Sequence, residues 1–158
     1  MTSVQEDRIK LSADGEVQLF RIDLRNNGGV LRFKADNDVT WQGNLYEGSA
    51  VQMSGYKRTA DEEVSRPTLT MANPAGILTA HAQSGRLERS IVTRYKVLYQ
   101  NLVNNLNIFE QDTWYISRVV AITKVSIVVE LRNPVDGPNF VTPARMYIPP
   151  EFPAVSLQ

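Results

Sequence analysis

Apolar and polar residues alternate over short runs along most of this chain, which is the pattern of β-strands that bury one face. Residues that favour turns stand between the runs, such as Asn26-Asn27-Gly28-Gly29 and Gly43-Asn44. The runs lie at residues 17–24, 30–35, 39–41, 45–46, 49–53, 68–71, 91–99, 114–122 and 125–131. Together they predict about eight short strands. The regular spacing of the turns indicates a mainly β fold, an antiparallel barrel or sandwich.

Some runs place apolar residues next to each other, which points apolar side chains to both faces of the strand. Leu19 and Phe20 are adjacent in the first run, and Val119-Val120 and Val128-Val129 repeat the pattern near the end. Such strands are expected to be covered on two sides. The last two runs form the clearest hairpin, which is expected to turn near Thr123-Lys124.

One short helix is expected after the run at 68–71. Asn73-Pro74 supplies an N-cap followed by a proline that suits the first helical position. Ile77, Leu78 and Ala82 then form a narrow apolar stripe, and Ser84-Gly85 is expected to end the helix.

Two other segments are predicted as loops. Residues 57–66 carry six charged side chains and only one apolar residue, Val64, so they are expected to form an exposed loop or a hairpin tip. Residues 101–112 contain four asparagines and are predicted to form a long loop.

The ends of the chain differ from its middle. Residues 1–14 are polar and are expected to be a loosely held lead-in to a single β-domain at 15–145. Residues 146–158 combine prolines with apolar side chains and are expected to form an extended C-terminal arm. The arm is expected to lie either on a neighbouring subunit or back on its own domain.

Composition excludes several classes of function. The 158 residues include 17 Lys and Arg and 17 Asp and Glu, so the net charge is zero. A neutral chain is not expected to bind nucleic acid or an anionic membrane through its charge, and it permits close self-association. The chain has no cysteine, so disulfides, thiolate metal sites and cysteine nucleophiles are excluded. The polar first ten residues give no secretory signal, and no run approaches the ~18 apolar residues of a membrane span.

A search for reactive constellations identifies no catalytic, metal-binding or cofactor-binding residues. His81 is the single histidine and is expected to be structural, on the helix near its end. Asp36-Asn37-Asp38 begins like a calcium loop, but position six is Trp41 where such a loop needs glycine, so a turn is predicted. The G-x-S-x-G motif of serine hydrolases is absent. Two of the 17 carboxylates could still meet in the fold as a glycosidase pair.

Two binding surfaces are considered and set aside. Trp41, Trp114 and the six tyrosines could form a sugar-stacking platform, but each tryptophan lies in a predicted strand among apolar residues, which favours core packing. The densest basic group consists of Arg86, Arg89, Arg94 and Lys96. It is balanced by acidic residues elsewhere and could equally be a set of exposed strand positions or an interface, so no nucleic-acid partner is predicted.

Several motifs in order along the chain resemble one known family. They are V-T-W-Q-G-x-x-Y at 39–46, S-G at 54–55 and R-P-T-L-T-x-x-N-x-x-G at 66–76. This set resembles the minor tail protein L family of lambda-type long-tailed bacteriophages, over roughly residues 15–145. Members of that family continue into a cysteine-rich segment that binds an iron–sulfur cluster. This chain has no cysteine, so the resemblance implies the β-domain alone, with no cofactor.

The resemblance implies a structural virion protein, not an enzyme, at the tail tip or baseplate. It implies a homo-oligomeric ring, expected to be a trimer, that connects the tail tube region to the central hub or receptor-binding fibre. Assembly is expected in the host cytoplasm. The alternatives are a carbohydrate-binding module of the tail tip and a cell-wall hydrolase. Three segments are expected to contact partner proteins: the charged loop at 57–66, the loop at 101–112 and the arm at 146–158. The contact residues expected by name come from the first and the last: Lys57, Arg58, Arg66, Met146, Tyr147, Ile148, Phe152 and Leu157.

Overall fold

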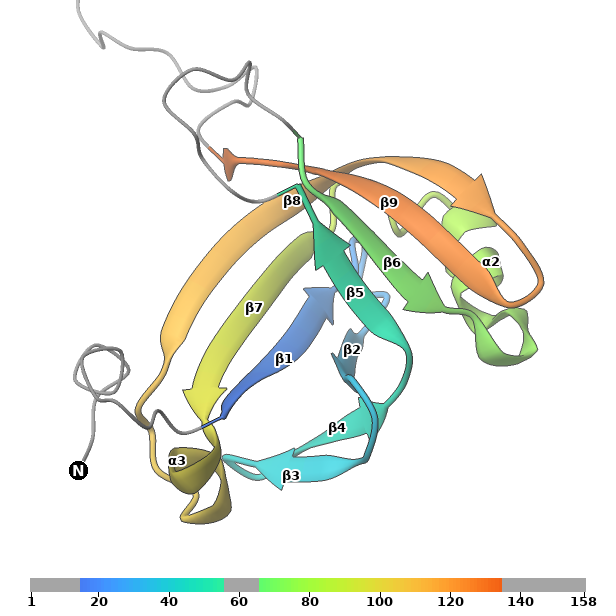
Figure 1. Ribbon diagram of the computed structural model, residues 1–158. Helices are drawn as coiled ribbons and strands as arrows, with labels where there is room; N and C mark the ends of the chain where they lie inside the picture. Colours follow the sequence, from blue (N-terminus) through green and yellow to red (C-terminus); the bar gives the residue numbers. More distant parts are fainter. Residues whose placement is uncertain (1–14, 56–65, 135–158) are drawn as a thin grey trace, which may run out of the picture.

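The computed structural model describes residues 15–55 and 66–134 (Figure 1). In this part of the chain the fold is mainly β, as predicted, with nine strands where about eight were expected. The strands are β1 (Glu16–Asp23), β2 (Val30–Lys34), β3 (Val39–Trp41), β4 (Asn44–Gly48), β5 (Val51–Ser54), β6 (Thr68–Ala72), β7 (Ile91–Leu98), β8 (Glu110–Ile122) and β9 (Ser126–Arg132). The helical segments are η1 (Pro74–Gly76), α2 (Ile77–Gln83) and α3 (Tyr99–Val103).

All nine strands belong to one curled sheet, in the order β3-β4-β2-β1-β7-β8-β9-β6-β5. Every neighbouring pair is antiparallel except β2 and β4, which pair in parallel through Phe33–Glu47 and Lys34–Gly48. The sheet curls so that β5 lies across the core from β1 and β2 (Figure 1), and Met53 and Phe33 belong to the same apolar cluster. The result is a barrel-like sheet.

The segment between β4 and β5 connects the two ends of the curled sheet. The backbone N–H of Ser49 donates to the carbonyl of Lys34 at 2.8 Å, and the carbonyl of Ala50 accepts from the N–H of Ala72 at 2.7 Å. Gly48 passes so close to the 36–38 turn that a Cβ there would overlap the carbonyl oxygen of Asp36. The Asp38 carboxylate accepts from the Gly48 N–H at 2.6 Å, so this turn is a structural corner, as predicted.

β1 separates two apolar cores. Leu19 belongs to a smaller core with Trp41, Tyr46, Val97 and Leu102. Phe20 and Ile22 point the other way, into the larger core inside the curl. The prediction that both faces of this strand are covered is therefore confirmed.

The same prediction is wrong for the end of β8. Register shifts between Ile116 and Arg118 and between Val119 and Ala121 mark β-bulges, which insert residues without cross-strand partners. Val119 packs against the larger core, whereas Val120 is the extra residue of the second bulge and is 52% exposed. The outward face of β8 is therefore not covered at Val120.

The predicted helix is present but begins later than expected. Residues 74–76 form η1, with positive φ at Ala75 (54°) and Gly76 (72°), and α2 begins at Ile77. Leu78 is buried and Ala82 packs on the larger core, but Ile77 is exposed and does not belong to the apolar stripe. Glycine suits position 76, because the left-handed conformation costs it nothing.

The predicted long loop at 101–112 is corrected at both ends. Residues 99–103 form α3 and β8 already begins at Glu110. Leu102 is buried in the smaller core, and the Trp41 indole N–H donates to the Leu106 carbonyl at 3.2 Å. Tertiary packing therefore orders a segment whose asparagines favour turns.

Candidate functional site

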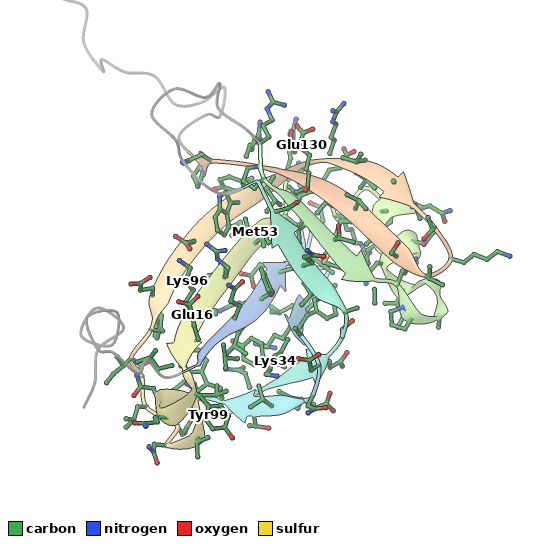
Figure 2. All side chains as sticks on the ribbon, in the orientation of Figure 1. Glu16, Lys34, Met53, Lys96, Tyr99 and Glu130 are labelled. Carbon is green, nitrogen blue, oxygen red and sulfur yellow. The ribbon has the colours of Figure 1, made fainter. Side chains whose placement is uncertain are left out.

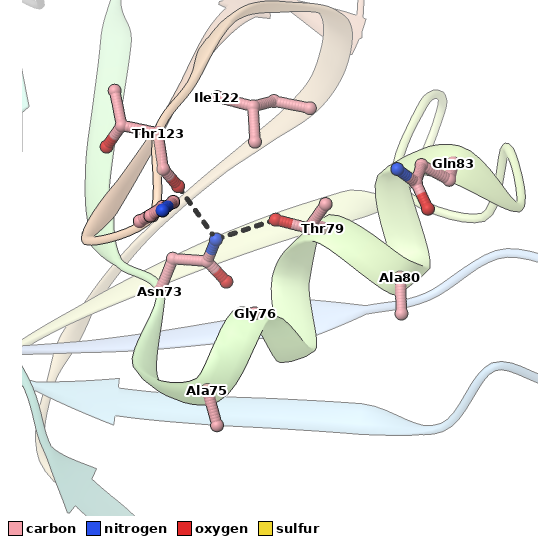
Figure 3. Close-up of a pocket in the computed structure, with 9 residues that line it drawn as sticks. Asn73, Ala75, Gly76, Thr79, Ala80, Gln83, Ile122 and Thr123 are labelled. Atoms are coloured by element: carbon pink, nitrogen blue, oxygen red, sulfur yellow. Dashed lines mark hydrogen bonds between the residues drawn. The ribbon is translucent and has the colours of Figure 1, made fainter.

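The buried residue Asn73 links η1, α2 and the β8–β9 turn at one end of the molecule. The Asn73 side-chain amide donates to the Thr79 hydroxyl at 2.7 Å and to the Thr123 carbonyl at 3.1 Å (Figure 3). Its carbonyl oxygen accepts from the Leu78 N–H at 3.0 Å, which caps α2 from five residues upstream. The Asn73 N–H donates to the Val125 carbonyl at 2.9 Å. This side chain thus fixes α2 against the β8–β9 turn.

The β8–β9 turn is itself well ordered. The Thr123 hydroxyl oxygen accepts from the Ser126 N–H at 2.9 Å and from the Val125 N–H at 3.3 Å, and its own proton donates to the Ser126 carbonyl at 3.0 Å. Such closure by a hydroxyl is typical of tight turns. The turn therefore holds its shape while its side chains remain exposed.

An open pocket of about 690 Å³ lies between this turn and α2. We call it the α2 pocket. Figure 3 shows Ile122 on one side and α2 on the other, with Ala75, Ala80 and Gln83 along the helical side. Lys124 supplies a positive charge to the lining, which is otherwise uncharged: Asn73, Ala75, Gly76, Thr79, Ala80, Gln83, Ile122 and Thr123. The helical side of the lining is made mostly of small side chains, Ala75, Gly76 and Ala80 among them.

A second exposed apolar surface lies on α3. Tyr99 and Val103 are four residues apart, so they share one face of the helix, and they are 58% and 64% exposed. The segment after α3 is fixed to the β3–β4 turn, because Asn105 accepts from the Gln42 N–H at 2.8 Å and its carbonyl accepts from the Gln42 amide at 2.8 Å. We call Tyr99 and Val103 the α3 ridge.

Of the residues predicted to contact partners, Arg66 is the one that the structure describes. Its guanidinium donates to Glu130 at 2.8 Å, and Arg118 donates to the other carboxylate oxygen at 3.0 Å. The hydrogen bond from Arg66, assisted by that from Arg118, outweighs desolvation and lowers the pKa of Glu130. Both arginines are mostly exposed, so this triad is a charged surface feature available for contact.

The other predicted contact residues lie outside the described part of the chain. They are Lys57, Arg58, Met146, Tyr147, Ile148, Phe152 and Leu157. The arm at 146–158 and most of the charged loop at 57–66 lie outside it as well.

Arg94 of the basic group is buried, whereas Arg86 and Arg89 of the same group are exposed. The Arg94 side chain is 2% exposed, donates to Asp112 at 2.6 Å and lies 5.1 Å from the Trp114 ring centroid. Desolvation would raise the pKa of Asp112, but the hydrogen bond from Arg94 and the charge of Lys96 outweigh it, so this pKa is lowered. The charges of Arg94, Lys96 and Asp112 therefore satisfy one another.

Both tryptophans pack inside, as predicted. Trp41 is buried in the smaller core, with its ring 5.4 Å from Phe109 and 5.6 Å from Tyr95. Trp114 packs against the larger core. A sugar-stacking platform built on these two rings is therefore not formed.

Within residues 15–55 and 66–134, no three acidic or histidine side chains come together as a metal site. His81 lies in the last turn of α2, as predicted from the sequence. In the same two ranges, no helix has the length and apolar character needed to cross a membrane. The exposed features of this part of the chain suit contact with other proteins: the α2 pocket, the α3 ridge and the Arg66–Glu130–Arg118 triad.

The sequence analysis identified Asn73 as a helix cap but missed the α2 pocket. It expected contacts from the segment 101–112, which contains Val103, but not from Tyr99. The adjacent valines at 119–120 were a signal for exposed apolar side chains on β8, which was interpreted as a covered face. The α3 ridge lay partly in a predicted loop, so its helical spacing was not visible.

Comparison with known proteins gives the same family as the sequence motifs. The model of the phage minor tail protein L family matches residues 24–151. The chain is 29% identical over 150 residues to tail tip protein L of Escherichia phage lambda; the match covers 84% of this chain and 64% of that protein. The chain thus spans just under two thirds of the length of this relative. We conclude that it belongs to the phage minor tail protein L family and has a structural role in a phage tail.

Proposed function

We propose that this protein forms a ring at the tail tip or baseplate and connects the tail tube region to the central hub or receptor-binding fibre. In this proposal the ring is a homotrimer that assembles in the host cytoplasm. The observation that carries the position is the relative in phage lambda, which is described as a tail tip protein. The ring is supported by zero net charge and by two unlike apolar surfaces on one chain.

The same proposal gives the protein no catalytic role. Support comes from the described carboxylates with lowered pKa values, Asp112 and Glu130, which are held in ion pairs with arginines. Neither carboxylate lines the α2 pocket. Ion pairs of this kind are typical of structural networks.

The arm at 146–158 and the loop at 57–66 are proposed as additional contact segments with neighbouring tail proteins. Support comes from composition, because the arm carries apolar side chains among prolines that prevent regular pairing. Deletion of residues 146–158 tests this role. Unchanged assembly after the deletion would contradict it.

The proposed location at the tail tip and the proposed ring are tested together in phage particles. A phage with a stop codon early in this gene should produce tails without a complete tip, and an antibody against the protein should label the tip of wild-type tails. Native mass spectrometry of the isolated tip should give the mass of a complex that contains three copies of this protein. Infective particles that lack the protein would overturn the proposal, and so would hydrolysis of peptidoglycan by the purified protein in a zymogram.

A further inference from the structure

Exposed apolar side chains gather at two places in the described residues. The large apolar side chains with the greatest exposure are Val30, Leu45, Ile77, Tyr99, Val103, Val120, Ile122 and Val125. Four of these eight lie on α2, the end of β8 and the β8–β9 turn, and one of the four, Ile122, lines the α2 pocket. Two others form the α3 ridge. Clustered exposure marks an interaction surface, whereas scattered single residues need no explanation.

The two places are separated by the length of β8. α3 lies just before this strand and the turn follows it, and Figure 1 shows them at opposite ends of β7 and β8. A strand of 13 residues spans about 40 Å. One chain therefore cannot bring its own α3 ridge to its own α2 pocket.

The shapes of the two surfaces differ in a complementary way. The α2 pocket is a hollow of about 690 Å³ with alanine and glycine on its helical side and Ile122 opposite. The α3 ridge is convex, because Tyr99 and Val103 project from one face of a short helix. Tyrosine is enriched at the centre of protein interfaces, where its ring is buried and its hydroxyl reaches the polar rim.

The charges beside the two surfaces are opposite in sign. Lys124 is exposed at the α2 pocket. Glu16 is exposed at the start of β1, where it is the register partner of Leu98, and the Tyr99 N–H donates to the carbonyl of the preceding Gly15 at 2.9 Å. Figure 2 shows Glu16 next to Lys96, farther along the sheet from Tyr99. If a ridge enters a pocket, Glu16 of one copy can approach Lys124 of the next.

We propose that the α3 ridge of one copy docks in the α2 pocket of the next copy, with Glu16 facing Lys124, so that the chain assembles head to tail. This inference rests on the proposed ring and adds its contact surfaces. Two different patches on one chain make a heterologous contact, which closes into a ring when the rotation per subunit permits it.

The absence of cysteine makes the contact directly testable by disulfide trapping. The full-length double variant Ala80→Cys/Val103→Cys places one thiol in the α2 pocket and one on the α3 ridge. Mild oxidation of isolated tails that contain it should give covalent oligomers up to the full ring on a non-reducing gel. Each single variant should remain monomeric, and a mixture of the two single variants should give dimers only.

The matched control replaces Val103 with another exposed apolar position. Leu45 is 53% exposed on β4, and Ala80→Cys/Leu45→Cys should give no oligomers. Disulfide dimers of either single variant would overturn the head-to-tail contact, because they require like surfaces to meet. Tails that contain the double variant without cross-links would also overturn it. A cross-link between Ala80→Cys and Phe152→Cys would instead assign the pocket to the arm.

The orientation is tested by exchanging the two charges. Lys124→Glu and Glu16→Lys should each lower the cross-linking yield about two- to fivefold, as expected for an exposed ion pair, and the two changes combined should restore it. If the variant with both changes gives a cross-linking yield no higher than the single variants do, the proposed orientation is overturned. Tails that assemble normally without the protein at their tip would instead refute the proposed function, which separates the two failures.

Discussion

β1 and the end of β8 each place two apolar residues in succession, and the fold uses them in opposite ways. Leu19 and Phe20 enter two different cores and are almost fully buried. Val119 packs inward, whereas Val120 is on the opposite face, where it is half exposed. The centre of the sheet therefore uses its apolar side chains for folding. The far end keeps several of them available for contact.

The largest expected effect on the free energy of unfolding is at Phe20, in the centre of the sheet. Phe20→Ala should lower the free energy of unfolding by about 3–5 kcal/mol, because it leaves a cavity in the larger core. Urea denaturation at neutral pH measures this loss. Val120→Ala is the matched change on β8 and should cost less than about 0.5 kcal/mol. A loss at Val120 as large as that at Phe20 would show that the outward face of β8 is covered and would break the comparison.

A smaller loss is expected where α2 joins the β8–β9 turn. Asn73→Ala removes the partner of the Leu78 N–H, the Thr79 hydroxyl and the Thr123 carbonyl, and should cost about 1–3 kcal/mol. Gln83 lines the same pocket on the exposed side of α2, so Gln83→Ala serves as the control and should change the free energy of unfolding little. Equal losses for the two variants would contradict the role of Asn73 as the link.

Glu130 should contribute less, and in a way that depends on pH. Its pKa is lowered below the usual 4.5, so the folded state holds this proton more weakly than the unfolded chain does. The carboxylate therefore stabilises the fold above pH 4.5, and this contribution is lost as the pH falls through the lowered pKa. Glu130→Gln should be less stable than the wild type at pH 7, and the difference should shrink in acid. A difference independent of pH would rule out the charge as its cause.

The smallest effect on folding is expected at the exposed apolar positions. Val103→Ser and Val125→Ser should each change the free energy of unfolding by no more than about 0.5 kcal/mol, because both side chains already face solvent. Incorporation into tails should nevertheless fall. Loss of stability at either position would show that these residues belong to the core of the monomer, which would remove the contrast between the two regions.

Local sequence signals identified most of the strands. Asn26, Asn27 and Gly29 adopt positive φ in the β1–β2 turn, as their residue types favour. The hairpin of β8 and β9 turns near Thr123-Lys124, as predicted. These features depend on neighbouring residues, so a single sequence is enough to find them.

Features that depend on distant residues were not predictable in the same way. α3 has no side-chain cap and is held by Leu102 in the smaller core. The parallel pairing of β2 with β4 and the bulges of β8 are set by the curl of the sheet. Asn73 reads as a helix cap locally, but its bond to Thr123 crosses 50 residues and appears only in the fold.

The central place of β1 has a consequence for synthesis on the ribosome. β1 is the first described strand to be made, yet it pairs with β7, which begins at Ile91, so translation of its second partner begins about 75 residues after Glu16. At ~5–20 residues per second this delay is about 4–15 s. During that time the β1–β2 hairpin has no β7 along one edge, so the nascent chain must stay soluble with a strand that is apolar on both faces.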